Sequence, residues 1–391
     1  MRKKLLTLLF ILLTPAAHAD FTTRAKSAFL IDYDSGMEIV AKNADTLMPP
    51  SSMIKLMTLA VLFDEIKAGR VTMDDRFPVS ENADYTNPTW APASKICLIA
   101  GQSVTVRDLI LGLIVLSGGD ASVVVAEKLA GSEGAFTAMM QEHARKIGMP
   151  MSTFGNASGL PHPNNLMTSR ELATLAAYVI REHPDIYPMF ATRRFEFSEY
   201  ESNWCRDWGR THTLNYNKLL FTMGGADGLK TGHTDSGGYG MVASANVGGR
   251  RLIGVINGLN VAGHDALAAE MKKLLEHGYA TTTTRVFYRP GDTVAQIPVW
   301  YGRAANVAAT VDKTFAVTLP KNKSTASLRV LARYEEPIPA PVAAGTKIGE
   351  ILAEWDGRVI ARAPLVAKTR VSKTQFLGRL IKNIGVIFGG K

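Results

Sequence analysis

The chain lacks several features that would assign a protein to a class at once. Only two cysteines, Cys97 and Cys205, occur among its 391 residues, and their spacing supports neither a metal site nor an assigned disulfide. The cations are spread through both halves without an arginine-rich or aromatic-interleaved pattern, so the net charge of +9 does not indicate nucleic-acid binding. With 46% hydrophobic and 20% charged residues, the sequence predicts a folded protein with room for two domains.

The N-terminus has the three parts of a secretory signal. Residues 2–4 are basic, residues 5–13 form an apolar run, and the small-x-small triplet at residues 17–19 would be the cleavage site. Because the run is too short to span a bilayer, we expect residues 1–19 to be removed and the mature protein to begin at Asp20, outside the cytoplasm. An uncleaved anchor is the alternative. For an exported protein, the positive net charge favours contact with a bacterial envelope or a lipid surface.

The rest of the sequence predicts two domains. In residues 20–282, strands are expected at both ends and helices between them, which predicts one sheet with a helical insertion. The expected strands are 28–33, 38–41, 228–231, 239–245 and 251–257, and the expected helices are 52–67, 106–116, 121–129, 169–181 and 265–278. Residues 283–370 change to short strand-like runs broken by proline and glycine, which is typical of a small all-β domain.

The last segment, residues 371–391, has the pattern of an amphipathic helix. On a helical projection, seven apolar residues fall on one arc and Arg379 and Lys382 lie outside it; the seven are Phe376, Leu377, Leu380, Ile381, Ile384, Ile387 and Phe388. The cationic flank and the terminal position favour a helix that lies in a membrane interface and anchors the protein peripherally. A terminal helix packed on the β domain is the alternative.

Ser52 and Lys55 form the only Ser-x-x-Lys in the chain and open a long apolar helical stretch. On a helix, residues i and i+3 share a face, so we expect the hydroxyl and the amine within reach of each other. A serine hydroxyl becomes a good nucleophile when a base takes its proton. Lysine is such a base only as the neutral amine, which requires burial or nearby positive charge. The pair is therefore a candidate nucleophile and base.

Two further motifs strengthen this interpretation. Lys230-Thr231-Gly232 is the only Lys-Thr-Gly in the chain and lies on an expected strand, and residues 117–120, Ser-Gly-Gly-Asp, lie at a helix junction. With the three motifs in this order, the chain resembles the low-molecular-mass penicillin-binding proteins of the D-alanyl-D-alanine carboxypeptidase family (peptidase S11). The segments 50–58, 215–220 and 227–235 also read like family segments, and the resemblance covers the whole chain.

The resemblance implies a fold. It is a serine transpeptidase or β-lactamase-like α/β (α+β) domain with an antiparallel sheet and a helical insertion, followed by an all-β domain and the tail helix. It also implies a reaction, the removal of the terminal D-alanine from peptidoglycan pentapeptide stems through an acyl-enzyme, with β-lactams as inhibitors. The implied location is the periplasmic face of the inner membrane.

Each motif residue then has an implied role. Ser52 corresponds to the acylated nucleophile, Lys55 to its base, and Ser117 to the serine that relays a proton towards the leaving D-alanine. Lys230 would attract the terminal carboxylate of the substrate and help to keep Lys55 neutral. No metal or cofactor is required, because an activated serine, a lysine base and an oxyanion hole suffice for acyl transfer.

The strand after Lys230 has a binding role in the same resemblance. Thr231 would donate a hydrogen bond to the carboxylate, and the backbone around Gly232 would pair with the substrate peptide as an added strand. The backbone N–H groups of Ser52 and His233 correspond to the oxyanion hole.

Two positions depart from the family pattern. Gly119 stands where the second motif has asparagine, and the loss of one hydrogen bond would slow the reaction on the order of 10- to 100-fold. His264 is the counterpart of an arginine that assists carboxylate binding in some relatives. These departures leave open a weakly acylating peptidoglycan-binding envelope or morphology protein. A β-lactamase is disfavoured, because residues 151–170 contain no glutamate to deacylate the drug and Glu171 begins the next helix.

Overall fold

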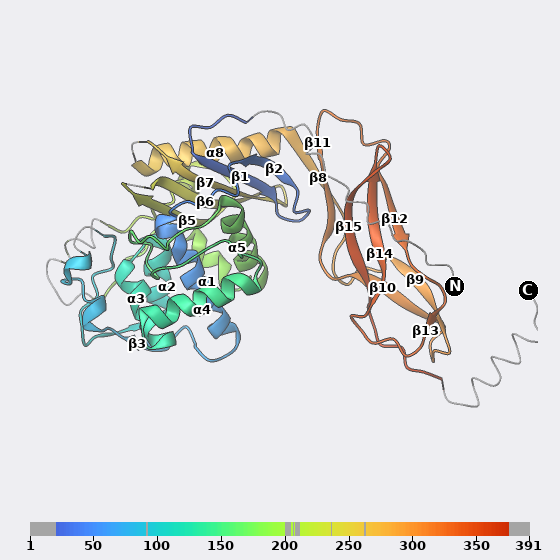
Figure 1. Cartoon of the computed structure of the whole chain (residues 1–391), viewed down its shortest axis with the longest axis horizontal. Helices are drawn as coiled ribbons and strands as arrows, with labels where there is room; N and C mark the ends of the chain where they lie inside the picture. Colours follow the sequence, from blue (N-terminus) through green and yellow to red (C-terminus); the bar gives the residue numbers. More distant parts are fainter. Residues whose placement is uncertain are drawn as a thin grey trace, which may run out of the picture.

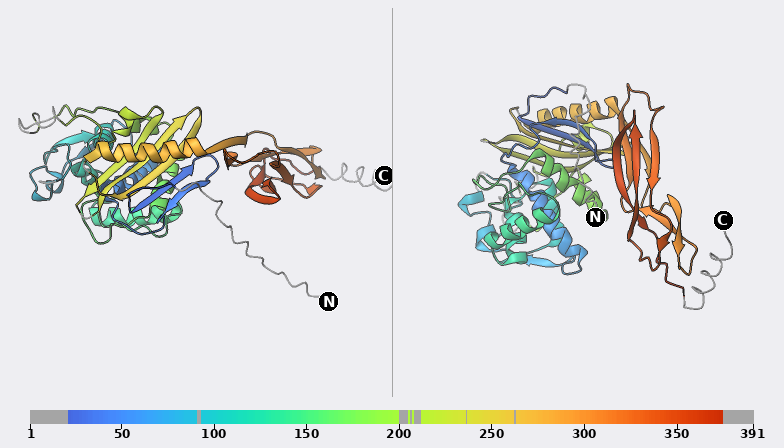
Figure 2. Two further views of the ribbon diagram at one scale, coloured as in Figure 1. Left: turned by 90° about the horizontal axis from the view of Figure 1, so that it is seen from above. Right: turned by 45° about the vertical axis from the view of Figure 1, so that its right-hand side comes forward.

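The computed structural model describes residues 21–90, 93–199, 205, 207, 212–235, 237–261 and 263–374. The predicted signal peptide and residues 375–391 of the predicted tail lie outside the described residues. Figure 1 shows a larger body of helices and strands beside a smaller body made of strands alone. Seen from above, the two bodies lie end to end (Figure 2).

A five-stranded sheet forms the centre of the larger body. Its order is β2-β1-β7-β6-β5, and every pair of neighbours is antiparallel. The strands are β1 (Ser27–Asp32), β2 (Glu38–Lys42), β5 (Ala226–Thr234), β6 (Gly238–Val247) and β7 (Arg250–Leu259). Strands from the two ends of this domain thus share one sheet, which confirms the predicted architecture. β5 is an edge strand, so one side of its backbone faces away from the sheet.

The segment between β2 and β5 is mainly helical and packs on one face of this sheet, while α8 covers the other face (Figure 1). The α-helices are α1 (Lys55–Lys67), α2 (Val106–Val115), α3 (Gly119–Ala130), α4 (Glu133–Lys146), α5 (Ser169–Glu182), α7 (Leu219–Thr222) and α8 (Gly263–Thr281). The short elements are η1 (Ser51–Ile54), η2 (Glu81–Ala83), η3 (Pro88–Trp90), η4 (Tyr187–Ala191), β3 (Arg76–Pro78) and β4 (Ser103–Thr105). None of the described helices combines the length and apolarity needed to cross a membrane.

Local sequence explains where several helices begin. The hydroxyls of Thr105, Ser132 and Thr168 accept hydrogen bonds from the backbone three residues later, which caps α2, α4 and α5. α4 is absent from the predicted helices, although Ser132 is a clear N-cap signal. Every residue of α1 from Lys55 to Phe63 is buried, as is every residue of α3 from Gly119 to Ala126. A helix buried on all sides is fixed by packing, and α1 fixes the turn η1 that precedes it.

The smaller body is the predicted β domain. β8 (Thr282–Tyr288) pairs with β11 (Phe315–Pro320), and a six-stranded sheet has the order β12-β14-β15-β10-β9-β13. Its strands are β9 (Ala295–Trp300), β10 (Asn306–Val311), β12 (Arg329–Arg333), β13 (Ile338–Pro339), β14 (Lys347–Trp355) and β15 (Arg358–Ala367). This domain has its own apolar core, and Ser35 in the larger body meets Thr318 of β11 at 2.7 Å between hydroxyl oxygens.

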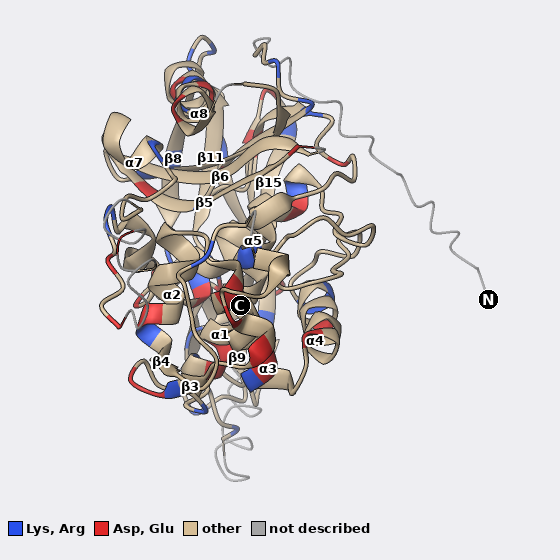
Figure 3. Ribbon diagram, turned by 90° about the vertical axis from the view of Figure 1, so that its left-hand side faces the viewer, with Lys and Arg blue, Asp and Glu red and all other residues tan. Residues whose placement is uncertain are grey.

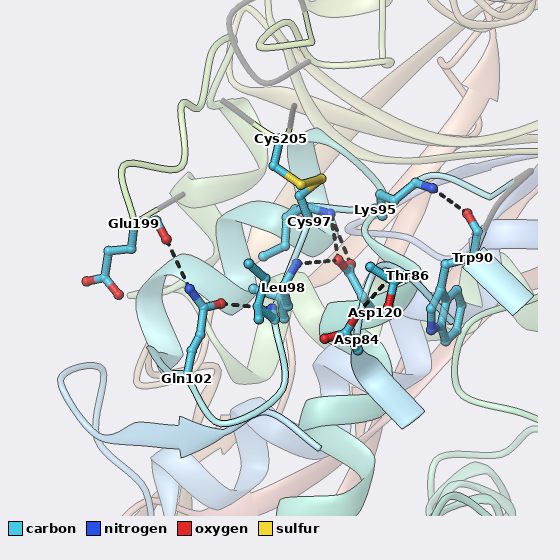
Figure 4. The surroundings of a disulfide bond; sticks show 12 residues. Asp84, Thr86, Trp90, Lys95, Cys97, Leu98, Gln102, Asp120, Glu199 and Cys205 are labelled. Carbon is cyan, nitrogen blue, oxygen red and sulfur yellow. Dashed lines mark hydrogen bonds between the residues drawn. A yellow bond between two sulfur atoms is a disulfide. The ribbon is translucent and has the colours of Figure 1, made fainter. Parts of the chain in front are cut away.

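Cys97 and Cys205 form a disulfide, which answers the question that their spacing leaves open (Figure 4). They are separated by 108 residues, and the Cα atoms lie 5.8 Å apart. The residues on either side of Cys97 are held separately, because the Asp120 carboxylate accepts hydrogen bonds from the N–H groups of Ile96 and Leu98 (Figure 4). The disulfide therefore ties the segment around Cys205 to a strip of backbone that is anchored on α3.

Replacing both cysteines, in Cys97→Ser/Cys205→Ser, should lower the free energy of unfolding by about 2–4 kcal/mol, since a long closed loop restricts the unfolded chain most. Urea unfolding of the oxidised mature protein and of the variant measures the difference. The unmutated protein treated with a reducing agent should unfold like the variant. Equal stability of the oxidised protein and the variant would contradict a structural role for the bridge.

Candidate active site

The turn η1 brings Ser52 and Lys55 together. The Lys55 Nζ lies 3.0 Å from the Ser52 Oγ and also donates a hydrogen bond to the carbonyl oxygen of Ser158. In a 3₁₀ turn, side chains at i and i+3 eclipse each other, so this geometry places the amine over the hydroxyl more directly than an α-helix would. Ser52 is partly exposed, whereas Lys55 is 2% exposed.

Burial sets the charge of the two motif lysines. It lowers the pKa of Lys55 to about 7, although the carboxylates of Asp120 and Glu133 act to raise it. Burial also lowers the pKa of Lys230 well below its ordinary value, and the charge of Lys55 lowers it further. Burial, rather than a charge on Lys230, is therefore the main reason why Lys55 is neutral for part of the time at pH 7. The expected help of Lys230 in keeping Lys55 neutral stays a prediction.

Two carboxylates that the sequence did not connect with Lys55 influence its charge. Asp120 in α3 is fully buried, and Glu133 at the start of α4 accepts a hydrogen bond from the Ala157 N–H at 2.9 Å. Burial raises the pKa of both carboxyl groups. Glu133 thus holds the loop whose Ser158 carbonyl accepts from Lys55. These carboxylates position the backbone around the base.

β5 runs beside η1, and Gly232 allows this close approach. A Cβ atom at Gly232 would lie 2.8 Å from the Pro50 carbonyl oxygen and 3.0 Å from the Ser52 nitrogen. Any larger residue would push the strand away from the nucleophile. A hydrogen bond of 3.0 Å between the hydroxyls of Ser51 and Thr234 also links the turn to the strand.

The remaining predicted residues of β5 lie along this edge. Lys230 and Thr231 are both buried, and the Lys230 Nζ donates to the Thr231 carbonyl oxygen at 2.8 Å. His233 is exposed, and its ring stacks on Tyr239 with 4.0 Å between ring centroids. The edge strand therefore presents a lysine amine, a hydroxyl-bearing residue and the backbone of an edge strand next to Ser52.

Ser117 lies in the turn between α2 and α3. Its φ angle of +57° is in the left-handed region, and its side chain is 3% exposed. Among the described residues, the Ser117 hydroxyl has no hydrogen-bond partner. An unsatisfied buried polar group costs about 1–3 kcal/mol. Such a hydroxyl is therefore free to exchange hydrogen bonds with a bound substrate.

Gly119 is packed against a large side chain. A Cβ atom at Gly119 would lie 2.6 Å from the Cζ3 atom of Trp90 and 3.3 Å from the Ser94 carbonyl oxygen. The Gly119 N–H donates to that same carbonyl at 2.8 Å, and Trp90 is buried. The indole ring thus occupies the volume in which an asparagine side chain would begin. In this chain, the apolar ring of Trp90 fills the position of the family's asparagine side chain.

His264 lies near the site but is not a cation. Its ring stacks on Tyr216 with centroids 5.1 Å apart and meets Tyr239 edge to face. Burial lowers the pKa of His264 to about 4, and the charges of Lys230 and Lys218 contribute to the shift. At neutral pH the imidazole is uncharged, so it does not replace the positive charge of the family's arginine.

The Glu171 carboxylate holds the start of a loop in place. It accepts hydrogen bonds from the Met151 N–H at 2.8 Å and from the Ser152 hydroxyl. It therefore fastens the start of the loop at residues 151–168 to α5, and this use of the carboxylate agrees with the argument against a β-lactamase.

The chain matches two family models. The model described as D-alanyl-D-alanine carboxypeptidase matches residues 14–260, and the model of the C-terminal domain of penicillin-binding protein 5 matches residues 270–373. The D-alanyl-D-alanine carboxypeptidase DacA of Escherichia coli (strain K12) is 32% identical over 367 residues, which are 93% of this chain and 88% of the relative. DacD of the same strain is 33% identical over 362 residues, 91% of this chain and 89% of the relative.

A solved structure supports the same assignment. Penicillin binding protein 5 from Haemophilus influenzae aligns with a TM-score of 0.78 at 30% identity, covering 91% of this chain and 99% of its own. The matches confirm the predicted fold of a catalytic domain followed by a β domain, and the predicted activity of a serine-type D-alanyl-D-alanine carboxypeptidase. The chain belongs to the D-alanyl-D-alanine carboxypeptidase family.

Proposed function

We propose that the protein removes the terminal D-alanine from peptidoglycan pentapeptide stems by acylation of Ser52. The observation that carries the proposal is the buried amine of Lys55, 3.0 Å from the Ser52 hydroxyl, beside an edge strand with Lys230 and Thr231. This is the minimum set for acyl transfer from a substrate with a terminal carboxylate, namely a nucleophile, a base and an anion-binding strand.

In the acylation step, neutral Lys55 takes the hydroxyl proton while the Ser52 Oγ attacks the carbonyl carbon of the penultimate D-alanine. The backbone N–H groups of Ser52 and His233 stabilise the oxyanion that forms. The proton then passes from Lys55, through the Ser117 hydroxyl, to the nitrogen of the departing D-alanine. The unpaired state of that hydroxyl among the described residues supports this relay. In the second step Lys55 takes a proton from the water that attacks the ester carbon, and it returns this proton to the Ser52 Oγ as the ester bond breaks and the shortened stem peptide leaves.

The substrate binds along β5. An extended peptide pairs with an edge strand through its backbone, as in other strand-addition complexes. Its terminal carboxylate lies against Lys230 and Thr231, and the negative charge raises the pKa of Lys230, so that the amine binds the substrate as an ammonium ion. β-Lactams acylate the same serine because their strained amide takes the place of the scissile peptide bond.

The protein acts outside the cytoplasm in this proposal. The basic, apolar and small-residue pattern of residues 1–19 supports export, and the amphipathic pattern of residues 373–388 supports peripheral attachment to the periplasmic face of the inner membrane.

Incubation of the mature protein with a fluorescent penicillin tests the nucleophile. We expect a stable covalent label that is absent from Ser52→Ala and present in Ser51→Ala, which removes the neighbouring hydroxyl. The unmutated protein should also release D-alanine from a diacyl-Lys-D-Ala-D-Ala peptide. An unlabelled wild-type protein, or a labelled Ser52→Ala variant, would overturn the proposal.

The acylation rate should depend on pH because only the neutral amine of Lys55 accepts a proton. The pKa of Lys55 is about 7, so the rate rises as pH increases through about 7 and reaches a plateau above it. Rapid-mixing measurements of penicillin acylation between about pH 5 and 9 give the profile. Lys55→Arg should lose acylation at every pH, since a guanidinium stays protonated. A rate that is flat across this range would contradict the assignment of Lys55 as the base.

The close contact between Gly119 and Trp90 predicts that the family's asparagine cannot simply be restored. Gly119→Asn should lower the free energy of unfolding by about 1–3 kcal/mol through overpacking, and it should not increase the acylation rate. Adding Trp90→Ala should recover part of the loss. Gly134→Asn is the matched control, because no atom lies within 4 Å of a Cβ at Gly134. Faster acylation by Gly119→Asn alone would show that the indole does not occupy that volume.

A further inference from the structure

The β domain ends, away from β8 and β11, in a surface that we call the tip and define as residues 300–303 and 370–374 (Figures 1 and 2). Trp300 is 48% exposed, and its ring stacks on Tyr301 with 5.4 Å between centroids. A large aromatic side chain that is half exposed leaves apolar surface in water, and a stacked pair of them is suited to an interface between water and an apolar phase.

The chain leaves the β domain at this aromatic pair. The Thr374 N–H donates to the Tyr301 carbonyl oxygen at 2.7 Å, and its hydroxyl donates to the Gly302 carbonyl oxygen at 2.8 Å. The Arg303 N–H donates to the Ser372 carbonyl oxygen at 2.8 Å. These bonds hold Thr374 beside Tyr301 and Gly302, and the amphipathic sequence of residues 375–391 follows Thr374 in the chain. In the sequence, the tail therefore continues directly from the tip.

The tip lies in the basic part of the chain. The last 35 residues, 357–391, contain no acidic residue, and they supply eight of the nine net positive charges. These eight cations are Arg358, Arg362, Lys368, Arg370, Lys373, Arg379, Lys382 and Lys391. Residues 293–311, which include the β9–β10 hairpin, also lack acidic residues. Charges of both signs are interspersed on the helices of the catalytic domain, in contrast (Figure 3).

The cations of the tip are free to meet an external anion. Arg303, Arg370 and Lys373 are exposed, and no acidic group among the described residues forms an ion pair with them. Uncompensated cations next to exposed tryptophan and tyrosine match the headgroup region of an anionic bilayer, where aromatic rings lie at the level of the headgroups.

We propose that the tip is a second membrane contact, in which Trp300 and Tyr301 enter the interface of an anionic phospholipid bilayer while Arg303, Arg370 and Lys373 meet its headgroups. The proposal rests on the proposed attachment of the tail. A tail alone would tether the protein without orienting it. Two contacts from adjoining points hold the β domain with β8 and β11 directed away from the bilayer, and this places the catalytic domain above the membrane surface.

Sedimentation with vesicles of equal parts phosphatidylcholine and phosphatidylglycerol tests the proposal on the full mature chain. We expect Trp300→Ala/Tyr301→Ala to lower the partition coefficient about tenfold, and Arg303→Gln about fivefold at low salt. Leu331→Ala/Tyr334→Ala is the matched control, because both side chains are 37% exposed in the same domain but lie outside the tip. The control should sediment like the unmutated protein. Labelling by fluorescent penicillin should be unchanged in all variants, which shows that they are folded.

Deletion of residues 375–391 separates the two contacts. If the truncated protein no longer sediments with the vesicles while the full-length Trp300→Ala/Tyr301→Ala variant stays fully bound, the tip proposal is overturned and the tail anchor stands. If the truncated protein still sediments with the vesicles, and loses this binding when Trp300 and Tyr301 are also replaced by alanine, the tip proposal stands and the tail anchor fails. Brominated lipids should quench tryptophan fluorescence in the unmutated protein more than in Trp300→Phe. Equal quenching of the two proteins would also overturn the tip proposal.

Discussion

The burial of one amine is the constraint on which the rest of the catalytic domain depends. Lys55 has to give up its proton near neutral pH, and burial of the side chain lowers its pKa to about 7. That burial requires a helix with no exposed face along its first residues, which in turn requires a sheet on one side and helices on the other. The fold thus sets the protonation state of the base, and Ser52 becomes a nucleophile because it stands next to that base.

The buried carboxylates of Asp120 and Glu133 act against this lowering of the Lys55 pKa. Asp120 accepts hydrogen bonds from the backbone on either side of Cys97, and Glu133 accepts one from the Ala157 N–H in the loop that carries Ser158. Their charge keeps the pKa of Lys55 from falling further. A base whose pKa lies near the working pH combines a useful neutral fraction with enough basicity to take a serine proton. The balance between burial and these two carboxylates therefore sets the pKa of Lys55.

The sequence predicted the parts of this arrangement that depend on short spacings. Ser52 and Lys55 are three residues apart, so their contact follows from local geometry, and the returning strands indicated a sheet that closes around helices. Contacts between distant segments could not be predicted in this way. The Ser158 carbonyl that accepts from Lys55 lies 103 residues away, and the disulfide partners lie 108 residues apart. The packing of Trp90 against Gly119 likewise depends on how a loop meets a helix, for which no spacing rule exists.

NMR of the protein labelled with ¹³C at the lysine Cε carbons measures the pKa of Lys55 without relying on catalysis. The resonance that is missing from Lys55→Arg identifies Lys55 in a pH titration of the unliganded protein. Because the side chain is buried, this resonance should titrate with a midpoint of about 7. A midpoint of about 10.4, the value of an unperturbed lysine, would contradict it.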